Sequence, residues 1–214
     1  SWCPWVMRMR SIASGPTGSP KSRRTDSSPA KRSAVDSPHP LPVSTSVTGP
    51  VGVRFCRIQS TARSSGVASG ISVTSAVGPG VFVPRPETEV TAGLAIDAAS
   101  AMGRQGDGVV VVDLCTGSGA IALAVKDELP GAEVLAVELS DLAHGWALAN
   151  RDHLGLDVEV RLGDATTAFD DLEGEVDVVV SNPPYIPVGA VPVDPEVRDH
   201  DPALALYGGS ADGL

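Results

Sequence analysis

The chain has 214 residues, of which 42% are hydrophobic, enough for one sizeable core, and its formal net charge is −10. The charge is uneven, since residues 1–79 hold ten basic and two acidic side chains and the rest hold six basic and 24 acidic ones. Such an acidic second half is a poor match for a nucleic-acid backbone and favours a protein or small-molecule substrate.

The cysteines and the apolar runs exclude further classes of protein. Cys3, Cys56 and Cys115 show no CxxC spacing, so neither a zinc site nor a disulfide framework is indicated, and a reducing cytoplasm is expected. No apolar run approaches the length of a membrane span, so we expect no membrane partner.

The first third of the chain lacks the signals of a packed core. Residues 1–75 contain 17 serines and no sustained apolar period of 2 or 3.6. We therefore predict a low-complexity, disordered leader over residues 1–76 and an ordered domain over residues 77–214. The basic side chains of the leader are scattered, which makes a nucleic-acid tail the less favoured alternative.

From residue 77 onward the chain predicts an α/β fold. A helix is expected to begin at Pro86, with Val90, Leu94, Ile96 and Ala98 as its apolar face. Alternating strands and helices follow, which is typical of a parallel sheet with right-handed crossovers. The expected strands cover residues 109–114, 133–137, 158–162 and 176–181; the expected helices cover 120–129 and 141–154, the latter with Ser140 as its N-cap.

A glycine-rich segment, Asp113-Leu-Cys-Thr-Gly-Ser-Gly-Ala, stands between the first of these strands and the next helix. Gly117 and Gly119 permit a tight turn and let a ligand lie against bare backbone. The segment lacks the third glycine of a dinucleotide fingerprint and the Gly-Lys-Ser/Thr of a phosphate loop. A ligand without phosphates is therefore favoured.

Polar side chains stand near the ends of all four expected strands, namely Asp113, Glu138, Asp164 and Asn182. Glu138 suits the two hydroxyls of a ribose, and Asp164 suits an adenine amine. Either acid alone is more often a solvated loop residue. Together and in this order, the four predict S-adenosylmethionine lying across the carboxyl ends of a parallel sheet.

The tetrapeptide Asn-Pro-Pro-Tyr follows the fourth strand and looks suited to methylating a planar nitrogen. Such a nitrogen is a poor nucleophile because its lone pair is delocalised, so a catalyst must hold and polarise it. The side-chain carbonyl of Asn182 can accept one N–H, the main-chain carbonyl of Pro183 a second, and Tyr185 offers a flat wall. The alternative is a proline-rich turn that merely ends a strand.

From about Val77 to Leu214 the chain resembles the bacterial protein-glutamine methyltransferases that act on class 1 peptide-chain release factors. The resemblance rests on VGPGVFVPRPETE, VVDLCTGSGAIALAV, AVELS, GDA and DVVVSNPPYIP, which stand in the family's order. It implies a Rossmann-like class I S-adenosylmethionine-dependent methyltransferase domain, here with the first four of seven strands. The implied partner is a release factor, and nucleic acid is disfavoured.

The resemblance also assigns residues to the ligands. The implied cofactor-binding residues are Asp113, Cys115, Thr116, Gly117, Ser118, Gly119, Glu138, Asp164, Ala165 and Asn182. The implied substrate-binding residues are Arg85, Pro86, Glu87, Asn182, Pro183, Pro184 and Tyr185, and we expect Asn182, Pro183 and Tyr185 to be catalytic without a metal. Cys115 stands where many relatives have glycine, and a quiet small residue is favoured there over a reactive thiol.

Two departures from the family leave other functions open. Because the fifth family strand does not follow, we expect a bare outer edge on the strand at Val176–Val180 and a poorly stable or inactive chain. Residues 1–75 lack the family's helical domain, for which a shifted reading frame or a wrong start is one hypothesis. The alternatives are amino-methylation of adenine or cytosine in nucleic acid, methylation of a ribosomal-protein glutamine, and an inactive fragment.

Overall fold

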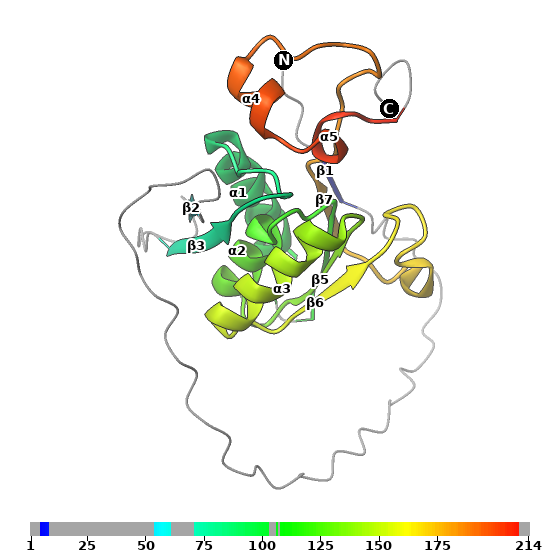
Figure 1. Ribbon diagram of the computed structural model, residues 1–214. Coiled ribbons are helices and arrows are strands. Elements are labelled where there is room, and N and C mark those ends of the chain that lie inside the picture. The colour runs from blue at the N-terminus through cyan, green and yellow to red at the C-terminus, as the bar shows by residue number, and fades with distance from the viewer. Residues whose placement is uncertain (1–4, 9–53, 61–70, 103–105, 107, 210–214) are drawn as a thin grey trace, which may run out of the picture. The chain divides into compact units, whose positions relative to one another are not determined.

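The computed structural model describes residues 5–8, 54–60, 71–102, 106 and 108–209. These residues form a five-stranded sheet and a separate two-stranded sheet (Figure 1). Helices alternate with the strands along the chain over residues 86–181, and two short helices follow. The five-stranded sheet has the order β1-β7-β4-β5-β6, with β1 at Trp5–Arg8, β4 at Val110–Leu114, β5 at Glu133–Glu138, β6 at Val158–Leu162 and β7 at Val178–Ser181.

Four of these strands are parallel, as the sequence predicts. β4 pairs with β5 and β7, and β5 pairs with β6, all in parallel register. Leu114 at the end of β4 lies opposite Val137 and Ser181, and Glu138 at the end of β5 lies opposite Leu162. The carboxyl ends of the four strands therefore meet at one edge of the sheet, where α/β proteins bind their ligands.

The fifth strand corrects an expectation about the sheet edge. β1 pairs with β7 in antiparallel register, from Trp5 opposite Ser181 to Arg8 opposite Val178. The predicted bare edge at Val176–Val180 is therefore wrong, because backbone N–H and C=O groups of β1 pair with those of β7. The antiparallel partner covers the backbone groups of β7, so β1 takes its place as the outer strand on that side of the sheet.

Three helices precede or connect the parallel strands. They are α1 at Pro86–Ser100, α2 at Ala120–Glu128 and α3 at Asp141–Leu154. The predicted N-cap of α3 is confirmed, since the Ser140 hydroxyl accepts a hydrogen bond from the amide of Ala143 at 3.4 Å. α3 ends at Gly155, whose φ of 65° is the left-handed conformation common after helices.

The buried face of α1 differs from the predicted one. Val90 and Leu94 are 60% and 47% exposed, so their assignment to the apolar face is wrong, whereas Ile96 is buried. The buried residues are Thr88, Thr91, Ala92, Ala95, Ile96 and Ala99. These positions repeat at three and four residues, the period of one helix face, and the small side chains let α1 approach its neighbours closely.

The main core lies between these helices and the parallel sheet. Every second residue of a strand faces this core, as Val134 and Ala136 do in β5 and Val178 and Val180 do in β7. α1 contacts α2 and β7, α2 contacts β4 and β5, and α3 contacts β5 and β6. The packing buries most of α2, from Ala120 to Val125. Such burial supplies the main free energy that holds the carboxyl edge of the sheet in place.

The two-stranded sheet lies within a part of the chain that the sequence predicts to lack a packed core. β2 at Arg54–Ser60 and β3 at Ile71–Val77 pair in antiparallel register. Val73, Ser75 and Val77 of β3 are buried in alternation, and Ser75 interrupts the apolar pattern that would have revealed the strand. The sequence missed β1, β2 and β3, and the domain boundary at residue 76 stays a prediction. Most of the predicted leader lies outside the described residues.

The chain beyond β7 returns toward the end of that strand. It forms two short helices, α4 at Pro195–His200 and α5 at Ala203–Leu206. The amide of Ile186 donates to the carbonyl of Leu206 at 2.8 Å, and that of Gly208 donates to the carbonyl of Ile186 at 3.1 Å. These bonds place the segment after α5 against the segment that follows Asn-Pro-Pro-Tyr.

Candidate functional site

The glycine-rich loop between β4 and α2 is tied together by Asp113. One carboxylate oxygen, Oδ2, accepts hydrogen bonds from the Thr116 hydroxyl at 2.6 Å and from the Ala122 amide at 3.2 Å. The loop is also tied to β5, because the Thr116 amide donates to the carbonyl of Val137 at 3.0 Å. Asp113 therefore joins the strand, the loop and the first turn of α2.

The Asp113 carboxyl is almost completely buried, and its second oxygen, Oδ1, has no hydrogen-bond partner among the described residues. Burial raises its pKa to about 7, against the opposing effect of the hydrogen bonds from Thr116 and Ala122, and the nearby Glu138 charge adds to the rise. Asp113 does not line the cavity described below, so it supports the loop from behind.

Two glycines give the loop its turn, as the sequence predicts. Gly117 has φ 61°, and a Cβ built on it would meet nothing within 4 Å. Gly119 has φ 82°, and a Cβ there would come within 3.1 Å of Cδ1 of Leu123 and 3.4 Å of Cβ of Ala147. Gly117 therefore leaves bare backbone facing open space, while Gly119 permits close packing of the loop against α2 and α3.

Cys115 also has a positive φ, 60°, which is rare for a residue with a side chain. The residue lines the cavity. Burial, together with the charges of Glu138 and Asp113, raises its pKa to about 11. A thiol with that pKa is protonated at neutral pH, which favours the quiet residue over the reactive one.

Glu138 at the end of β5 anchors two backbone amides. Its Oε2 accepts from the amide of Gly117 at 2.8 Å, and its Oε1 accepts from the amide of Ser140 at 2.9 Å. A carboxylate oxygen has about two acceptor positions, so each oxygen of Glu138 keeps one for a further donor. This arrangement fixes a carboxylate at the carboxyl edge of the sheet and leaves it able to bind two hydroxyls.

Asp164 and Ala165, which the resemblance assigns to the adenine, follow β6 but do not line the cavity. Asp164 is exposed, and its Oδ1 accepts from both the amide and the hydroxyl of Thr166, which lowers its pKa. Its charge nevertheless contributes to raising the pKa of Cys115, although it is the weakest of the causes. The structure therefore leaves Asp164 near the loop but outside the wall of the cavity.

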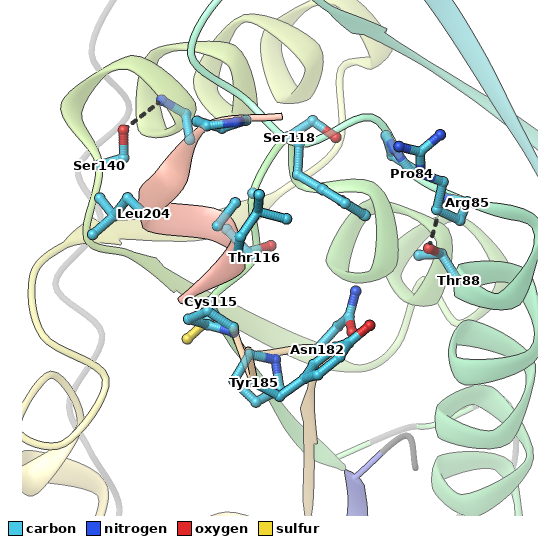
Figure 2. Close-up of a pocket in the computed structure, with 18 of the residues that line it drawn as sticks. Pro84, Arg85, Thr88, Cys115, Thr116, Ser118, Ser140, Asn182, Tyr185 and Leu204 are labelled. Carbon is cyan, nitrogen blue, oxygen red and sulfur yellow. Dashed lines mark hydrogen bonds between the residues drawn. The ribbon is translucent and has the colours of Figure 1, made fainter. Parts of the chain in front are cut away.

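The Asn-Pro-Pro-Tyr segment lies at the end of β7, beside the loop. The Ser181 hydroxyl donates to the carbonyl of Leu114 at 3.0 Å, which ties the end of β7 to the end of β4. Asn182 is half-buried and makes no hydrogen bond to another described residue. Tyr185 is 53% exposed, and partial burial and the Glu87 charge raise its pKa. Figure 2 shows the Asn182 and Tyr185 side chains next to each other at the cavity.

The opposite side of the cavity comes from the start of α1. The Arg85 guanidinium donates to Oδ2 of Asp201 at 2.9 Å and lies over the ring of Phe82, 5.5 Å from its centroid. The Arg85 amide also donates to the Thr88 hydroxyl at 3.1 Å, the dashed contact beside Arg85 in Figure 2. Arg85 thus connects the start of α1 to the segment around α4 and α5.

These elements enclose one cavity of about 610 Å³, within the size range of small-molecule sites. Of the predicted residues it brings together Arg85, Pro86, Glu87, Cys115, Thr116, Gly117, Ser118, Glu138, Asn182, Pro183, Pro184 and Tyr185. Asp113 and Gly119 support the loop, and Asp164 and Ala165 lie outside. Figure 2 shows that the labelled residues of the loop, α1, α5 and β7 surround the same space.

Sequence reasoning missed several residues of the wall. Ser140, Leu139 and the stretch from Leu204 to Gly209 line the cavity, and Asp201 holds Arg85. Ser140 was recognisable only as a helix cap. Asp201 carried no signal, because its partner stands 116 positions earlier in the chain.

Among the described residues, no group of three or more His, Cys, Asp or Glu side chains is placed to hold a metal ion. None of their helices is long and apolar enough to cross a membrane.

Comparison with known proteins identifies related sequences. Residues 86–193 match the family model described as methyltransferase small domain. The release factor glutamine methyltransferase of Streptomyces coelicolor is 60% identical over 141 residues, which are 64% of this chain and 48% of that protein. Several other curated relatives carry the same name. The resemblance to release factor glutamine methyltransferases that the sequence predicts is therefore confirmed.

A relative with a different name is nearly as similar. The 4-amino-L-phenylalanine/4-methylamino-L-phenylalanine methyltransferase of Streptomyces pristinaespiralis is 47% identical over 132 residues, 61% of this chain and 44% of that protein. A solved ribosomal-RNA methyltransferase of T. thermophilus aligns with a TM-score of 0.44 and 24% identity, covering 65% of this chain and 36% of that one. The chain spans about half the length of the curated relatives it matches.

Proposed function

The chain belongs to the methyltransferase small domain family, and on that premise we propose that it methylates the side-chain amide nitrogen of a glutamine in a class 1 peptide-chain release factor. The methyltransferase class, the Rossmann-like fold and the cofactor S-adenosylmethionine agree with the sequence prediction. The observation that carries the proposed substrate is the position of Asn182 and Tyr185 beside the cofactor loop in one cavity.

The residues of the loop fit an adenosyl ligand without phosphates. Gly117 leaves open space where a side chain would stand, and both Glu138 oxygens keep an acceptor position for the ribose hydroxyls. The Glu138 carboxylate places negative charge beside the loop, which suits a cationic sulfonium ligand. When bound, the cofactor would supply an electrophilic methyl group on its sulfonium sulfur, and the neutral thioether would be the leaving group.

The Asn-Pro-Pro-Tyr segment is proposed to hold the amide. Asn182 Oδ1 would accept one N–H of the glutamine, and the main-chain carbonyl of Pro183 would accept the other. Two accepting oxygens orient the nitrogen toward the methyl group and stabilise the positive charge that develops on it. The nitrogen–carbon bond would form as the sulfur–carbon bond breaks, and one amide proton would pass to solvent water, which leaves a neutral methylamide.

The outer wall of the cavity is proposed to receive the substrate chain. Tyr185, which is half-exposed, lies beside Asn182, and its phenol is neutral at physiological pH, since its ordinary pKa of 10.0 is raised further here. Arg85, held by Asp201, and the neighbouring Pro86 and Glu87 border the same side. An exposed aromatic wall next to a half-buried amide suits a glutamine presented on a protein loop.

A methyl-transfer assay tests this proposal. The 214-residue chain would be given labelled S-adenosylmethionine and a class 1 release factor, and methylglutamine would be identified by mass spectrometry. Asn182→Ala should lower the rate by about a hundredfold, the range for losing one oriented polar contact in a transition state. Tyr185→Phe, which keeps the flat ring, should retain most of the activity. An unchanged rate in Asn182→Ala would refute the assignment.

A second candidate function is methylation of a small aromatic amine. The relative from Streptomyces pristinaespiralis is named for such a substrate, and an aryl-amine nitrogen is planar like an amide. The same assay with 4-amino-L-phenylalanine in place of the release factor separates the two. Methylation of DNA would favour the nucleic-acid alternative, which the 24 acidic side chains after residue 79 disfavour. The cytoplasmic location and the absence of a membrane partner stay predictions.

A further inference from the structure

Asn150, near the end of α3, makes three hydrogen bonds to backbone groups from two distant segments. Its Oδ1 accepts from the amide of Ala76 at 2.8 Å, and its Nδ2 donates to the carbonyl of Ala76 at 2.9 Å and to that of Ser118 at 2.9 Å. The side chain is buried, with 3% exposure. A buried amide satisfied by three backbone partners defines its surroundings closely, since each partner would otherwise be left unpaired.

The bond to Ser118 acts at the centre of the cofactor loop. Ser118 stands between Gly117 and Gly119, which both have positive φ, so the direction of its carbonyl determines the turn of the loop. One helical turn before Asn150, Ala147 is fully buried against Gly119, where a Cβ would come within 3.5 Å of the Ala147 Cα. α3 therefore contacts the loop through both its backbone and a specific hydrogen bond.

The other end of α3 reaches the same loop. The amide of Ser140, the N-cap, donates to Oε1 of Glu138, and Oε2 of Glu138 accepts from Gly117. Hydrogen bonds thus run from Gly117 through Glu138 to the beginning of α3 and from Asn150, near its end, back to Ser118. The 14-residue helix braces the loop at two points, and Asn150 supplies one of them.

We propose that Asn150 is a positioning residue for the cofactor, which acts by fixing the Ser118 carbonyl and thereby the backbone against which S-adenosylmethionine lies. The inference rests on the proposed function only for the identity of the cofactor. It does not depend on which nitrogen is methylated. No direct contact between Asn150 and the cofactor is required, because Asn150 does not line the cavity.

The test compares affinity for S-adenosylhomocysteine, the product form of the cofactor, by calorimetric titration without any methyl acceptor. Asn150→Asp keeps nearly the same volume and an acceptor for the Ala76 amide but removes the donor to the carbonyls of Ser118 and Ala76. Asn150→Ala removes all three bonds. Each should raise the dissociation constant about tenfold or more, the equivalent of one well-formed hydrogen bond.

Two control variants separate positioning from general instability. Ile96→Ala shortens a fully buried side chain of α1 that does not line the cavity, and so lowers the melting temperature without touching the loop. His153→Ala changes an exposed residue on α3 itself. Both should bind S-adenosylhomocysteine as the unchanged chain does, at a temperature at which every variant is folded.

Amide hydrogen exchange supplies a second measurement that instability alone would not reproduce. In Asn150→Asp without ligand, the amides of Gly117 and Gly119 should exchange faster relative to the β4 amides than they do in Ile96→Ala. Equal affinity in Asn150→Asp and Ile96→Ala would overturn the inference, as would no binding by the unchanged chain. If the chain bound S-adenosylhomocysteine but failed to methylate a release factor, the proposed function would fail and this inference would stand.

Discussion

Replacing the buried Asp113 by asparagine should remove a pH dependence of folding. Asp113 has a pKa of about 7 in the folded chain against 3.8 as its ordinary value. Between about pH 4 and pH 7 the folded state therefore holds one proton more than the unfolded state, and stability falls as the pH rises. The whole difference corresponds to on the order of 4 kcal/mol, at about 1.4 kcal/mol for each unit.

The substitution is suited to this test because of the contacts of Asp113. An asparagine side chain keeps an oxygen that can accept from both the Thr116 hydroxyl and the Ala122 amide, but it cannot ionise. The side-chain NH₂ group of the variant replaces Oδ1, which has no partner among the described residues, and this changes the stability by an offset that is constant with pH. The offset does not affect the slope against pH.

Urea unfolding of the chain and of Asp113→Asn at half-unit steps from pH 4 to pH 8 measures the two free energies of unfolding. The difference between the two free energies of unfolding should change by several kcal/mol between pH 4 and pH 7 and then level off. The unchanged chain should become less stable relative to Asp113→Asn as the pH rises through this range. Other titrating groups contribute to both proteins and cancel. A difference that stays flat across this window would show that Asp113 ionises normally and that burial does not control its charge.

Three further predictions concern the wall of the cavity. Cys115, with its pKa raised to about 11, should react with iodoacetamide at pH 8 far more slowly than free glutathione. Peptide mapping by mass spectrometry measures the rate, and a rate equal to that of glutathione would favour the reactive thiol over the quiet residue. Gly119→Ala, which brings a Cβ within 3.1 Å of Leu123 at φ 82°, should destabilise the chain by about 1–2 kcal/mol in thermal unfolding and weaken binding of S-adenosylhomocysteine. Arg85→Gln should speed limited proteolysis around Asp201, whose side chain is only 4% exposed. Asp201→Asn should have the same effect, because it removes the other half of the same ion pair. A double variant that is cleaved much faster than either single variant would argue against a shared contact.

Much of the α/β framework was predictable because local signals agree with the tertiary structure. The helix at Asp141–Leu154 has a serine cap before it and Gly155 after it, and the strand at Val158–Leu162 follows within four residues. Local signals failed where neighbours decide the outcome. Val90 and Leu94 are apolar but exposed, because the smaller residues on another face of α1 are the ones that fit the core.

The candidate site was predictable for a related reason. In a parallel sheet the strand ends meet at one edge, so residues that follow successive strands come together whatever lies between them. Glu138 and Asn182 were found in this way, and both line the cavity. Asp164 follows the same rule along the chain, yet it bonds to Thr166 and does not line the cavity.

The sequence by itself determined the alternation of helices and parallel strands from α1 to β7, the glycine turn and the Asn-Pro-Pro-Tyr segment, because these depend on the preferences of neighbouring residues. Only the tertiary structure decided which distant groups meet. Asn150 bonds to residues 32 and 74 positions away, and Arg85 to one 116 positions away. Such contacts leave no trace in local patterns, since they form only when the core between them has packed.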